Sequence, residues 1–291
     1  MPLAFTGHDL DKDDHARADP EQLARLRARD DARLLALDGL MPLFDDGVLL
    51  TSGLTDVSAD AELVYLGLRE GSPLFVAVPA EGDQRNAITM RETMLALMRL
   101  PPAELALYGG ARSIADWHAR HRFCAQCGSR TQIAKGGWQR GCPSCKAQHF
   151  PRVDPVAIML VEHQGSLLVG RGQGWPEGSY SALAGFVEPG ESIEEGVKRE
   201  VWEEVGIRVR DVSYIASQPW PFPSQLMIGC HAFADSRELT IDETEIADAR
   251  WFTRAEVAQA MANPKDSTPF RPPLATAIAH YLLRHWLDNM A

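Results

Sequence analysis

The segment from residue 185 to residue 207 contains the side chains best suited to chemistry, three glutamates at helical spacing: Glu200, Glu203 and Glu204. Ser192 and Glu195 have the spacing of a capping box, and Gly206 is a typical C-cap, so we predict a helix from about Ile193 to Gly206. On an ideal helix the three carboxylates share an arc of about 100°. That arc overlaps the edge of the helix's valine stripe, so the carboxylates lie beside the core rather than in open water.

Three adjacent carboxylates beside a core are costly in free energy unless a positive group joins them. Oxygen ligands of this kind suit Mg²⁺ or Mn²⁺, ions that also bind the phosphate oxygens of a substrate. The alternative is an acidic, solvated helix face, which is usual for a glutamate-rich helix. The segment matches the pattern G-x5-E-x7-R-E-U-x-E-E-x-G-U at every position from Gly185 to Ile207, where U is aliphatic. A match at every position would rarely arise by chance, which argues against an ordinary solvated helix face and favours the metal site.

Four of the five cysteines form a second group with metal-ligand spacing: Cys124, Cys127, Cys142 and Cys145. Two C-x2-C pairs separated by fourteen residues predict a zinc ribbon, in which four thiolates fill a tetrahedral site and leave no position for water. The predicted zinc is therefore structural. There are two alternatives to a zinc site. The cysteines could be four free core thiols, or they could form disulfides, which would need an oxidising compartment. Cys230, on an apolar run, is predicted to be a buried core thiol.

The residues around these cysteines are basic. Between Trp117 and Val153 there is no acidic residue, and there are seven basic ones: Arg120, Arg122, Arg130, Lys135, Arg140, Lys146 and Arg152. This polarity would steer a polyanion toward one face of the molecule. In the alternative interpretation, the basic residues merely offset the thiolate charge. The sequence leaves both interpretations open.

Length and charge limit the remaining possibilities. The 291 residues are 45% apolar, enough for one large domain or two ordinary ones. The 29 basic and 40 acidic residues give a net charge of −11, which argues against a whole-surface binder of nucleic acid or anionic membrane. No run approaches the roughly 18 apolar residues of a membrane span, and the N-terminal residues lack a signal pattern. We therefore expect a soluble, cytoplasmic protein with no membrane partner.

The first 110 residues carry no chemical motif. We expect a loose acid-rich segment from His8 to Gln22 and a hairpin of residues 63–68 and 74–78. Helices are predicted over Arg91–Arg99 and from Ala103 to about Arg120, the second interrupted or frayed near Gly109 and Gly110.

The last 136 residues alternate strands and helices, which is typical of an α/β region. A strand pair is expected across the turn at His163–Gly165. The further predicted elements are strands over Val156–Val161, Leu167–Val169, Leu226–Ala234 and Ala249–Phe252, helices over Arg254–Met261 and Leu274–Leu287, and a loop over Pro264–Pro273.

The glutamate segment resembles the signature of the Nudix hydrolases, which cleave a diphosphate that joins a nucleoside to another group. The resemblance implies the α/β (α+β) class and an α-β-α sandwich. It also implies catalytic roles and Mg²⁺ or Mn²⁺ ligation for Glu200, Glu203 and Glu204, without assigning the base. Further metal ligands are implied at the Ala184 carbonyl and at Glu245, and a structural brace is implied between Glu191 and Arg199.

A second motif lies at Ser217–Gln225. Taken by itself, this run of three prolines with Trp220 and Phe222 is either an aromatic wall for a base or a packed surface loop. It resembles the S-Q-P-W-P-F-P-x-S motif of the NADH pyrophosphatase subgroup, except that Gln225 replaces the final serine and Ser224 stands one place early. The resemblance implies these substrate-binding residues, with Phe150 and Phe186 around the nicotinamide: Phe150, Phe186, Gln218, Trp220, Ser224, Gln225, Ala279 and Arg91.

The resemblance also implies a domain order. We expect a smaller mixed α/β domain over 1–118 for scaffolding and dimerisation, a four-Cys zinc ribbon over 119–151, and a Nudix domain over 152–291. The expected substrate is NADH or NAD, cleaved to nicotinamide mononucleotide (NMN) and AMP. NAD-capped RNA would give NMN and 5′-monophosphate RNA. The alternatives are hydrolysis of ADP-ribose or dinucleoside polyphosphates, and a non-catalytic zinc-ribbon protein that binds nucleic acid.

Overall fold

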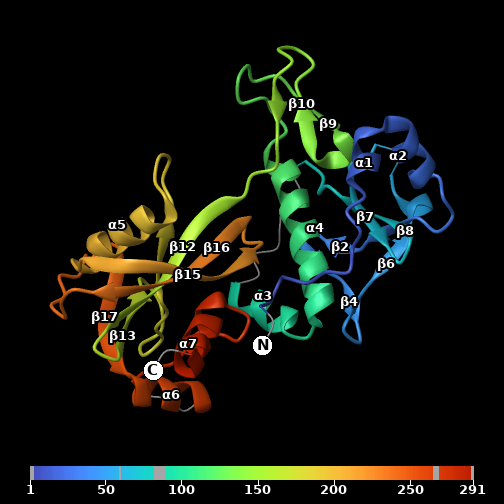
Figure 1. The fold of residues 1–291 in the computed structure, drawn as a ribbon. Helices are drawn as coiled ribbons and strands as arrows, with labels where there is room; N and C mark the ends of the chain where they lie inside the picture. The colour runs from blue at the N-terminus through green and yellow to red at the C-terminus, as the bar shows by residue number, and fades with distance from the viewer. Residues whose placement is uncertain (1–2, 59, 82–89, 265–268, 290–291) are drawn as a thin grey trace. The chain divides into compact units, whose positions relative to one another are not determined.

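The computed structural model describes residues 3–58, 60–81, 90–264 and 269–289 (Figure 1). The chain divides into two compact units. Unit 1 contains the first residues as far as Ala4, together with Asp154–Pro219 and Gln225–Ala291. Unit 2 contains Phe5–Val153 and Trp220–Ser224. The candidate metal ligands are therefore divided between the two units, with the glutamates in unit 1 and the four cysteines in unit 2.

Unit 1 is built around a six-stranded sheet (Figure 1). Its strands follow the order β15-β16-β12-β13-β17, and β14 pairs with β12. Strand β12 is parallel to β16 and antiparallel to β13 and β14, and β13 is antiparallel to β17. The strands are β12 (Asp154–His163), β13 (Ser166–Gly172), β14 (Leu183–Phe186), β15 (Val209–Trp220), β16 (Gln225–Ala234) and β17 (Ile246–Thr253).

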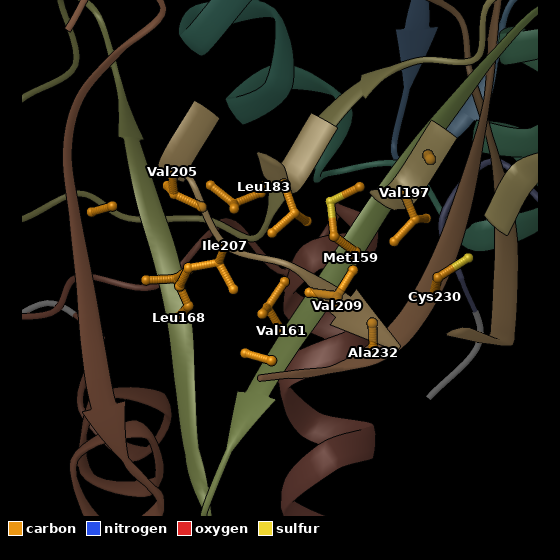
Figure 2. Close-up of a cluster of buried hydrophobic side chains, with 14 of the residues drawn as sticks. Met159, Val161, Leu168, Leu183, Val197, Val205, Ile207, Val209, Cys230 and Ala232 are labelled. Atoms are coloured by element: carbon orange, nitrogen blue, oxygen red, sulfur yellow. The ribbon is translucent and has the colours of Figure 1, made fainter. Parts of the chain in front are cut away.

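Alternation along β12 gives the sheet two apolar faces, because successive side chains of a strand point to opposite sides. Met159 and Val161 join a buried cluster with the valines of α5 (Ile193–Val205) (Figure 2). Ile158 and Leu160 join a second cluster with α6 (Arg254–Ala262) and α7 (Ile278–Asn289). Unit 1 is therefore an α-β-α sandwich, which confirms the predicted fold class.

Helix α5 begins and ends where the sequence indicates. The Ser192 hydroxyl accepts from the Glu195 N–H at 3.2 Å, and the Glu195 carboxylate accepts from the Ser192 N–H at 2.7 Å. Gly206 closes the helix in the left-handed region at φ 70°. The predicted capping box and C-cap are both confirmed.

Unit 2 contains a four-stranded sheet in the order β6-β1-β8-β7 and a three-stranded sheet in the order β11-β10-β9. The predicted hairpin is the antiparallel pair of β7 and β8. The strands are β1 (Arg33–Leu35), β2 (Leu37–Asp38), β3 (Met41–Pro42), β4 (Phe44–Asp45), β5 (Val48–Leu49), β6 (Thr51–Gly53), β7 (Leu63–Arg69), β8 (Ser72–Ala77), β9 (Gln132–Ala134), β10 (Gln139–Gly141) and β11 (Gln148–His149). The helical elements are α1 (Asp14–Ala18), α2 (Pro20–Arg27), η1 (Leu54–Asp56), α3 (Met90–Leu97), α4 (Pro102–Arg120) and η2 (Lys135–Gly137).

Two predictions for this unit are wrong. The acid-rich segment from residue 8 to 22 is ordered into α1 and the start of α2, because Leu10 and Ala16 are buried. Helix α4 is continuous through Gly109 and Gly110. A Cβ at Gly109 would lie 2.9 Å from Cδ1 of the buried Phe5, so this glycine gives Phe5 room against the helix.

Helix α7 begins at Ile278, four residues later than predicted. The Ile278 N–H donates to the side-chain oxygen of Gln218 at 2.8 Å, which satisfies one of the free N–H groups at the start of the helix. Part of the predicted proline-rich loop, residues 265–268, lies outside the described residues. No helix in the described part of the chain is long and apolar enough to cross a bilayer.

The cluster in Figure 2 predicts the cost of truncating a core side chain. Leu168 is fully buried in it, so Leu168→Ala should lower the free energy of unfolding by about 2–5 kcal/mol, measured by urea denaturation. Leu274→Ala is the control, because Leu274 is 42% exposed and its truncation should change stability by less than about 0.5 kcal/mol. Equal effects from the two variants would contradict this assignment of the core.

Candidate metal and substrate site

The three glutamates of α5 differ in burial. Glu204 is 7% exposed, the Glu200 side chain is 12% exposed, and the Glu203 side chain is 49% exposed. All three lie on a helix whose Val197, Val201 and Val205 are fixed in the core. Because these valines hold the helix against the core, Glu204 is kept on the buried side of the helix.

Glu204 has an orphaned oxygen. Its Oε2 is buried and has no hydrogen-bond partner among the described residues. Burial, together with repulsion from Glu200 and Glu245, raises the pKa of the Glu204 carboxyl to about 8. Burial also raises the pKa of Glu200. A buried carboxylate with an unused oxygen and further carboxylates nearby fits a hard divalent cation with oxygen ligands.

Arg199 is the cation that the chain itself supplies here. Its Nε and Nη2 donate to the two oxygens of Glu191 at 2.6 and 3.0 Å, a bidentate pair, and this pair lowers the pKa of Glu191. Nη1 donates to Glu200 at 2.9 Å and to Glu203 at 2.8 Å. Nη2 also donates to the Phe186 carbonyl at 2.8 Å. The arginine therefore joins the helix to the residues that precede it.

Gly185 allows Glu200 to reach strand β14. A Cβ at Gly185 would lie 1.8 Å from the Glu200 carboxyl carbon, so a side chain at this position would displace the carboxylate. The neighbouring Ala184 faces Ile158 in the β12–β14 ladder. The structure thus places the Glu200 carboxylate against the backbone next to Ala184, the predicted carbonyl ligand.

Glu245 approaches the α5 carboxylates from another element. It is exposed, immediately precedes β17, and raises the pKa of both Glu200 and Glu204 by charge repulsion. Among the described residues, only the four cysteines form a group whose ligand atoms all lie within 4.8 Å of one another. The described glutamates form no such group, and Glu200 and Glu203 share one nitrogen of Arg199. Their role as metal ligands stays a prediction.

The four cysteines have the geometry of a zinc site. The Sγ atoms of Cys124 and Cys145 lie 3.6 Å apart, and those of Cys127 and Cys142 lie 3.5 Å apart. Tetrahedral zinc with bonds of about 2.3 Å needs sulfur atoms about 3.8 Å apart. His149 Nε2 lies 3.3 Å from Cys124 Sγ, where it can donate to a thiolate. The donor set therefore fits a structural zinc ion.

Two predicted substrate residues, Gln218 and Ala279, are buried and contact other parts of unit 1. Gln218 is 1% exposed, and besides Ile278 its amide contacts the carbonyls of Ala4 at 3.1 Å and Thr276 at 3.0 Å. Ala279 is 2% exposed in the core cluster with α6 and α7. In this structure Gln218 holds the start of α7, and Ala279 packs in the core, while their predicted contacts with a substrate stay predictions.

The other predicted substrate residues are more accessible. Phe186 in unit 1 is 52% exposed, and Phe150 in unit 2 is 58% exposed. Ser224 and Gln225 are half-buried. Arg91 is on α3, and its side chain lies outside the described residues.

The aromatic residues of the proline-rich run pack on one another in unit 2. The Trp220 ring makes edge contacts with Phe5 at 5.8 Å and Phe222 at 5.4 Å between centroids. Arg112 lies over the Phe222 ring at 4.4 Å and donates to the Pro221 carbonyl. The run is therefore a packed segment with a half-buried tryptophan. Sequence reasoning missed the contacts of Arg112 with Pro221 and Phe222, because these two residues lie more than 100 positions away along the chain.

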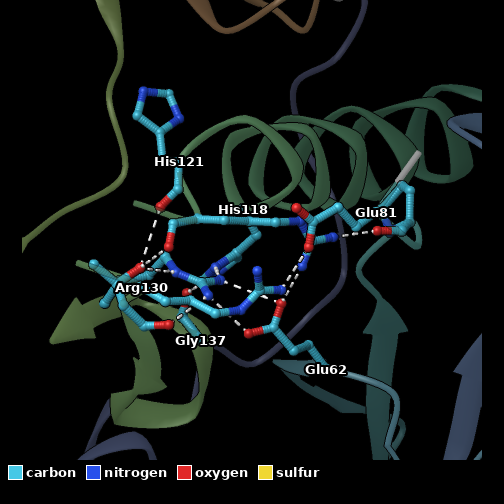
Figure 3. A network of polar contacts seen from close by, with 10 residues as sticks. Glu62, Glu81, His118, His121, Arg130 and Gly137 are labelled. Atoms are coloured by element: carbon cyan, nitrogen blue, oxygen red, sulfur yellow. Dashed lines mark hydrogen bonds and ion pairs between the residues drawn. The ribbon is translucent and has the colours of Figure 1, made fainter. Parts of the chain in front are cut away.

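The basic ribbon is largely neutralised within unit 2 (Figure 3). Arg122 and the fully buried Arg140 both bind Glu62, each at 2.8 Å. Arg140 also contacts His118 Nδ1 at 2.9 Å, and burial lowers the pKa of this histidine to about 4.

Two further ribbon arginines are paired. Arg130 binds Glu81 at 2.7 Å, and Arg120 binds Asp116 at 2.5 Å. Both acids lie outside the window that contains no acid, as does Glu62. Neither interpretation of the sequence foresaw these pairs, and the seven basic residues do not form one free cationic surface.

Removing one thiolate should release the zinc ion. Cys127→Ser is expected to lose zinc and to lower the melting temperature of unit 2, because the ribbon has few apolar groups to replace the metal. Metal content by mass spectrometry of the intact protein and a thermal melt would measure both effects. Cys230→Ala is the control, since this buried thiol of unit 1 should leave one zinc per chain. Retention of zinc by Cys127→Ser would contradict the four-thiolate site.

Comparison with known proteins assigns the three segments. Family models match residues 16–117 (NADH pyrophosphatase-like rudimentary NUDIX domain), 119–150 (NADH pyrophosphatase zinc ribbon domain) and 151–272 (NUDIX domain).

Three relatives show the extent of the similarity. The chain is 46% identical over 212 residues to the NAD-capped RNA hydrolase NUDT12 of Homo sapiens, covering 69% of this chain and 46% of that protein. It is 36% identical to the NAD(P)H pyrophosphatase NUDT13, mitochondrial, of Mus musculus (87% and 76% covered). It is 37% identical to the NAD-capped RNA hydrolase NudC of Chromobacterium violaceum (78% and 81%). The chain spans about half the length of the human relative. The chain belongs to the Nudix hydrolase family, with the zinc ribbon of the NADH pyrophosphatases.

Proposed function

We propose that the chain hydrolyses the diphosphate of NADH or NAD to NMN and AMP. The observation that carries this proposal is the buried Glu204 carboxylate, which has an unpartnered oxygen and lies close to two other carboxylates. Relatives named NAD(P)H pyrophosphatase and NAD-capped RNA hydrolase support the choice of substrate. The residues proposed to hold Mg²⁺ or Mn²⁺ are Glu200, Glu203, Glu204, Glu245 and the carbonyl of Ala184.

The chemistry follows from charge. A dinucleotide diphosphate carries two negative charges that repel an incoming water, and its leaving group departs as a phosphate anion. A bound divalent cation neutralises the phosphates and lowers the pKa of a water molecule. Glu204 and Glu200 would bind this ion through oxygens that are already shielded from solvent. Arg199, fixed by Glu191, keeps a positive charge next to the carboxylates. Phe186 offers an exposed ring for stacking on a base.

We propose RNA that carries NAD at its 5′ end as a further substrate, because the same diphosphate bond is present there. Its products would be NMN and RNA with a 5′-monophosphate. The names of two relatives support this substrate. Four of the seven ribbon cations are already paired with acids, so the ribbon contributes less electrostatic steering of RNA than its composition indicates.

We further propose that residues 1–118 scaffold a homodimer, beside a ribbon over 119–151 and a hydrolase domain over 152–291. Within residues 1–118, several apolar side chains are 44–55% exposed and support an association surface: Leu43, Val48, Leu50, Leu95 and Met98. A reducing, cytoplasmic location is proposed because the zinc site depends on free thiolates.

The dimer is tested by light scattering. We expect a mass of twice the 32.1 kDa chain, and we expect Val48→Glu to shift the population toward the monomer, because it places a charge on the apolar surface. Leu274→Glu, at an exposed site of unit 1, is the control and should leave the mass unchanged. A wild-type protein that stays monomeric at every concentration would refute the dimer.

The activity is tested by mass analysis of products after incubation with Mg²⁺ or Mn²⁺. We expect NMN and AMP from NADH, and we expect Glu204→Gln to lose orders of magnitude in turnover while folding normally, because the amide cannot neutralise a cation. Glu194→Gln removes the same charge from an exposed position of α5 and should retain activity.

Parallel incubations separate the candidate substrates. Faster cleavage of ADP-ribose or dinucleoside polyphosphates than of NADH would point to another Nudix specificity. Near-normal turnover by Glu204→Gln would contradict the metal assignment. Intact dinucleotides throughout would leave a zinc-stabilised nucleic-acid binder as the remaining interpretation.

A further inference from the structure

The segment Thr240–Glu245 is fastened to the end of α5. The Thr240 N–H donates to the Val205 carbonyl at 2.9 Å, and the Asp242 N–H donates to the Glu204 carbonyl at 2.9 Å. The last four carbonyls of a helix have no partner within the helix, and here two of them hold this segment. Gly206 permits the approach, because a Cβ there would lie 2.8 Å from the Thr240 Cβ.

Asp242 then organises the turn that leads to Glu245. Its Oδ1 accepts from the N–H of Thr244 at 2.8 Å and from the Thr244 hydroxyl at 2.6 Å. Its backbone carbonyl accepts from the N–H groups of Glu245 and Ile246, both at 3.1 Å. One residue therefore bonds through its own N–H to Glu204 and through its own C=O to Glu245.

A third contact holds the same segment against the sheet. Gln173 directly follows β13, and its side-chain amide donates to the Glu243 carbonyl at 2.7 Å. Gly172 of β13 faces Ile246 of β17 in the ladder. The peptide before Glu245 is thus fixed from the helix side by Asp242 and from the sheet side by Gln173.

We infer that Asp242 is a positioning residue that sets the place of the Glu245 carboxylate relative to that of Glu204. The inference rests on the proposed function, in which both carboxylates hold one cation site. Magnesium tolerates little departure from octahedral geometry, so a ligand on an exposed loop needs a rigid support. Asp242 supplies this support. Its Oδ1 accepts hydrogen bonds from the N–H and from the hydroxyl of Thr244, and the turn cannot open without breaking both of these bonds.

Direct ligation of the metal by Asp242 is the competing interpretation, and substitution by asparagine separates the two. Asparagine keeps the Oδ1 acceptor for Thr244 and loses the negative charge. A positioning role survives this change, whereas a charged ligand does not. Alanine removes the acceptor, and both roles are lost.

The experiment titrates Mn²⁺ into the full-length, zinc-loaded chain without substrate and follows binding by electron paramagnetic resonance. We expect Asp242→Ala to raise the Kd for Mn²⁺ by about 10- to 100-fold, the usual effect of losing a residue that orients a ligand. Asp242→Asn should stay within about threefold of wild type, since the hydrogen bonds remain. Asp235→Ala, an exposed acid at the end of β16, is the matched control and should bind Mn²⁺ like wild type.

Hydrolysis of NADH provides the second readout. For Asp242→Ala, kcat at saturating Mn²⁺ should recover to within about tenfold of wild type, while the Mn²⁺ concentration for half-maximal rate rises in step with Kd. If Asp242→Ala does not fold, Thr244→Val replaces it, because that variant removes only the hydroxyl donor and should raise the Kd several-fold.

The outcomes are distinguishable. Wild-type binding of Mn²⁺ by Asp242→Ala, or binding by Asp242→Asn as weak as by Asp242→Ala, overturns the positioning role while hydrolysis by wild type stands. A wild-type chain that binds no Mn²⁺ and cleaves no NADH overturns the proposed function itself, and the inference with it.

Discussion

The burial of the Glu204 carboxylate is the constraint on which the rest of unit 1 depends. On α5 the apolar residues occupy an arc of about 0° to 120°, counted from Ile193, and Glu204 falls inside it at about 20°. Glu200 falls at its edge and Glu203 well outside, which is the order of exposure that the side chains show. Burying an unpaired charge costs several kcal/mol, so a fold that fixes Glu204 here needs a cation to make the charged form stable.

Much of this site was predictable because its determinants are local. The capping box at Ser192, the left-handed Gly206 and the valine spacing all act within one helix, so the sequence alone fixes where α5 begins, ends and turns. The cysteine pairs behave in the same way, since each C-x2-C turn brings its two sulfur atoms together. The strand over Val156–Val161 was likewise predictable from its apolar run, and strand geometry then places neighbouring residues on opposite faces of the sheet.

What the sequence could not reveal depends on partners distant along the chain. Glu62, which immediately precedes β7, neutralises Arg122 and Arg140, and a charge count within the ribbon cannot include it. The amide of Gln218 caps α7 across 60 residues, so a motif that resembles a substrate loop also serves packing. Gly109 was expected to weaken α4, but its missing side chain makes room for Phe5. In each case tertiary contact decided the role of a residue whose local preference pointed elsewhere.

The two arginine networks show why one is structural and the other is suited to binding. Arg140 is fully buried and binds Glu62, His118 and Thr131, so none of its bonds breaks without leaving a buried polar group unpaired. Arg199 is anchored by Glu191 and the Phe186 carbonyl, which are not proposed ligands, and it reaches Glu200 and Glu203 through one nitrogen. In the proposed function, Glu200 and Glu203 would exchange this nitrogen for a divalent cation while the arginine stays in place. The bonds from Arg199 to Glu191 and to the Phe186 carbonyl would remain in both states, so the residues before α5 would stay joined to the helix.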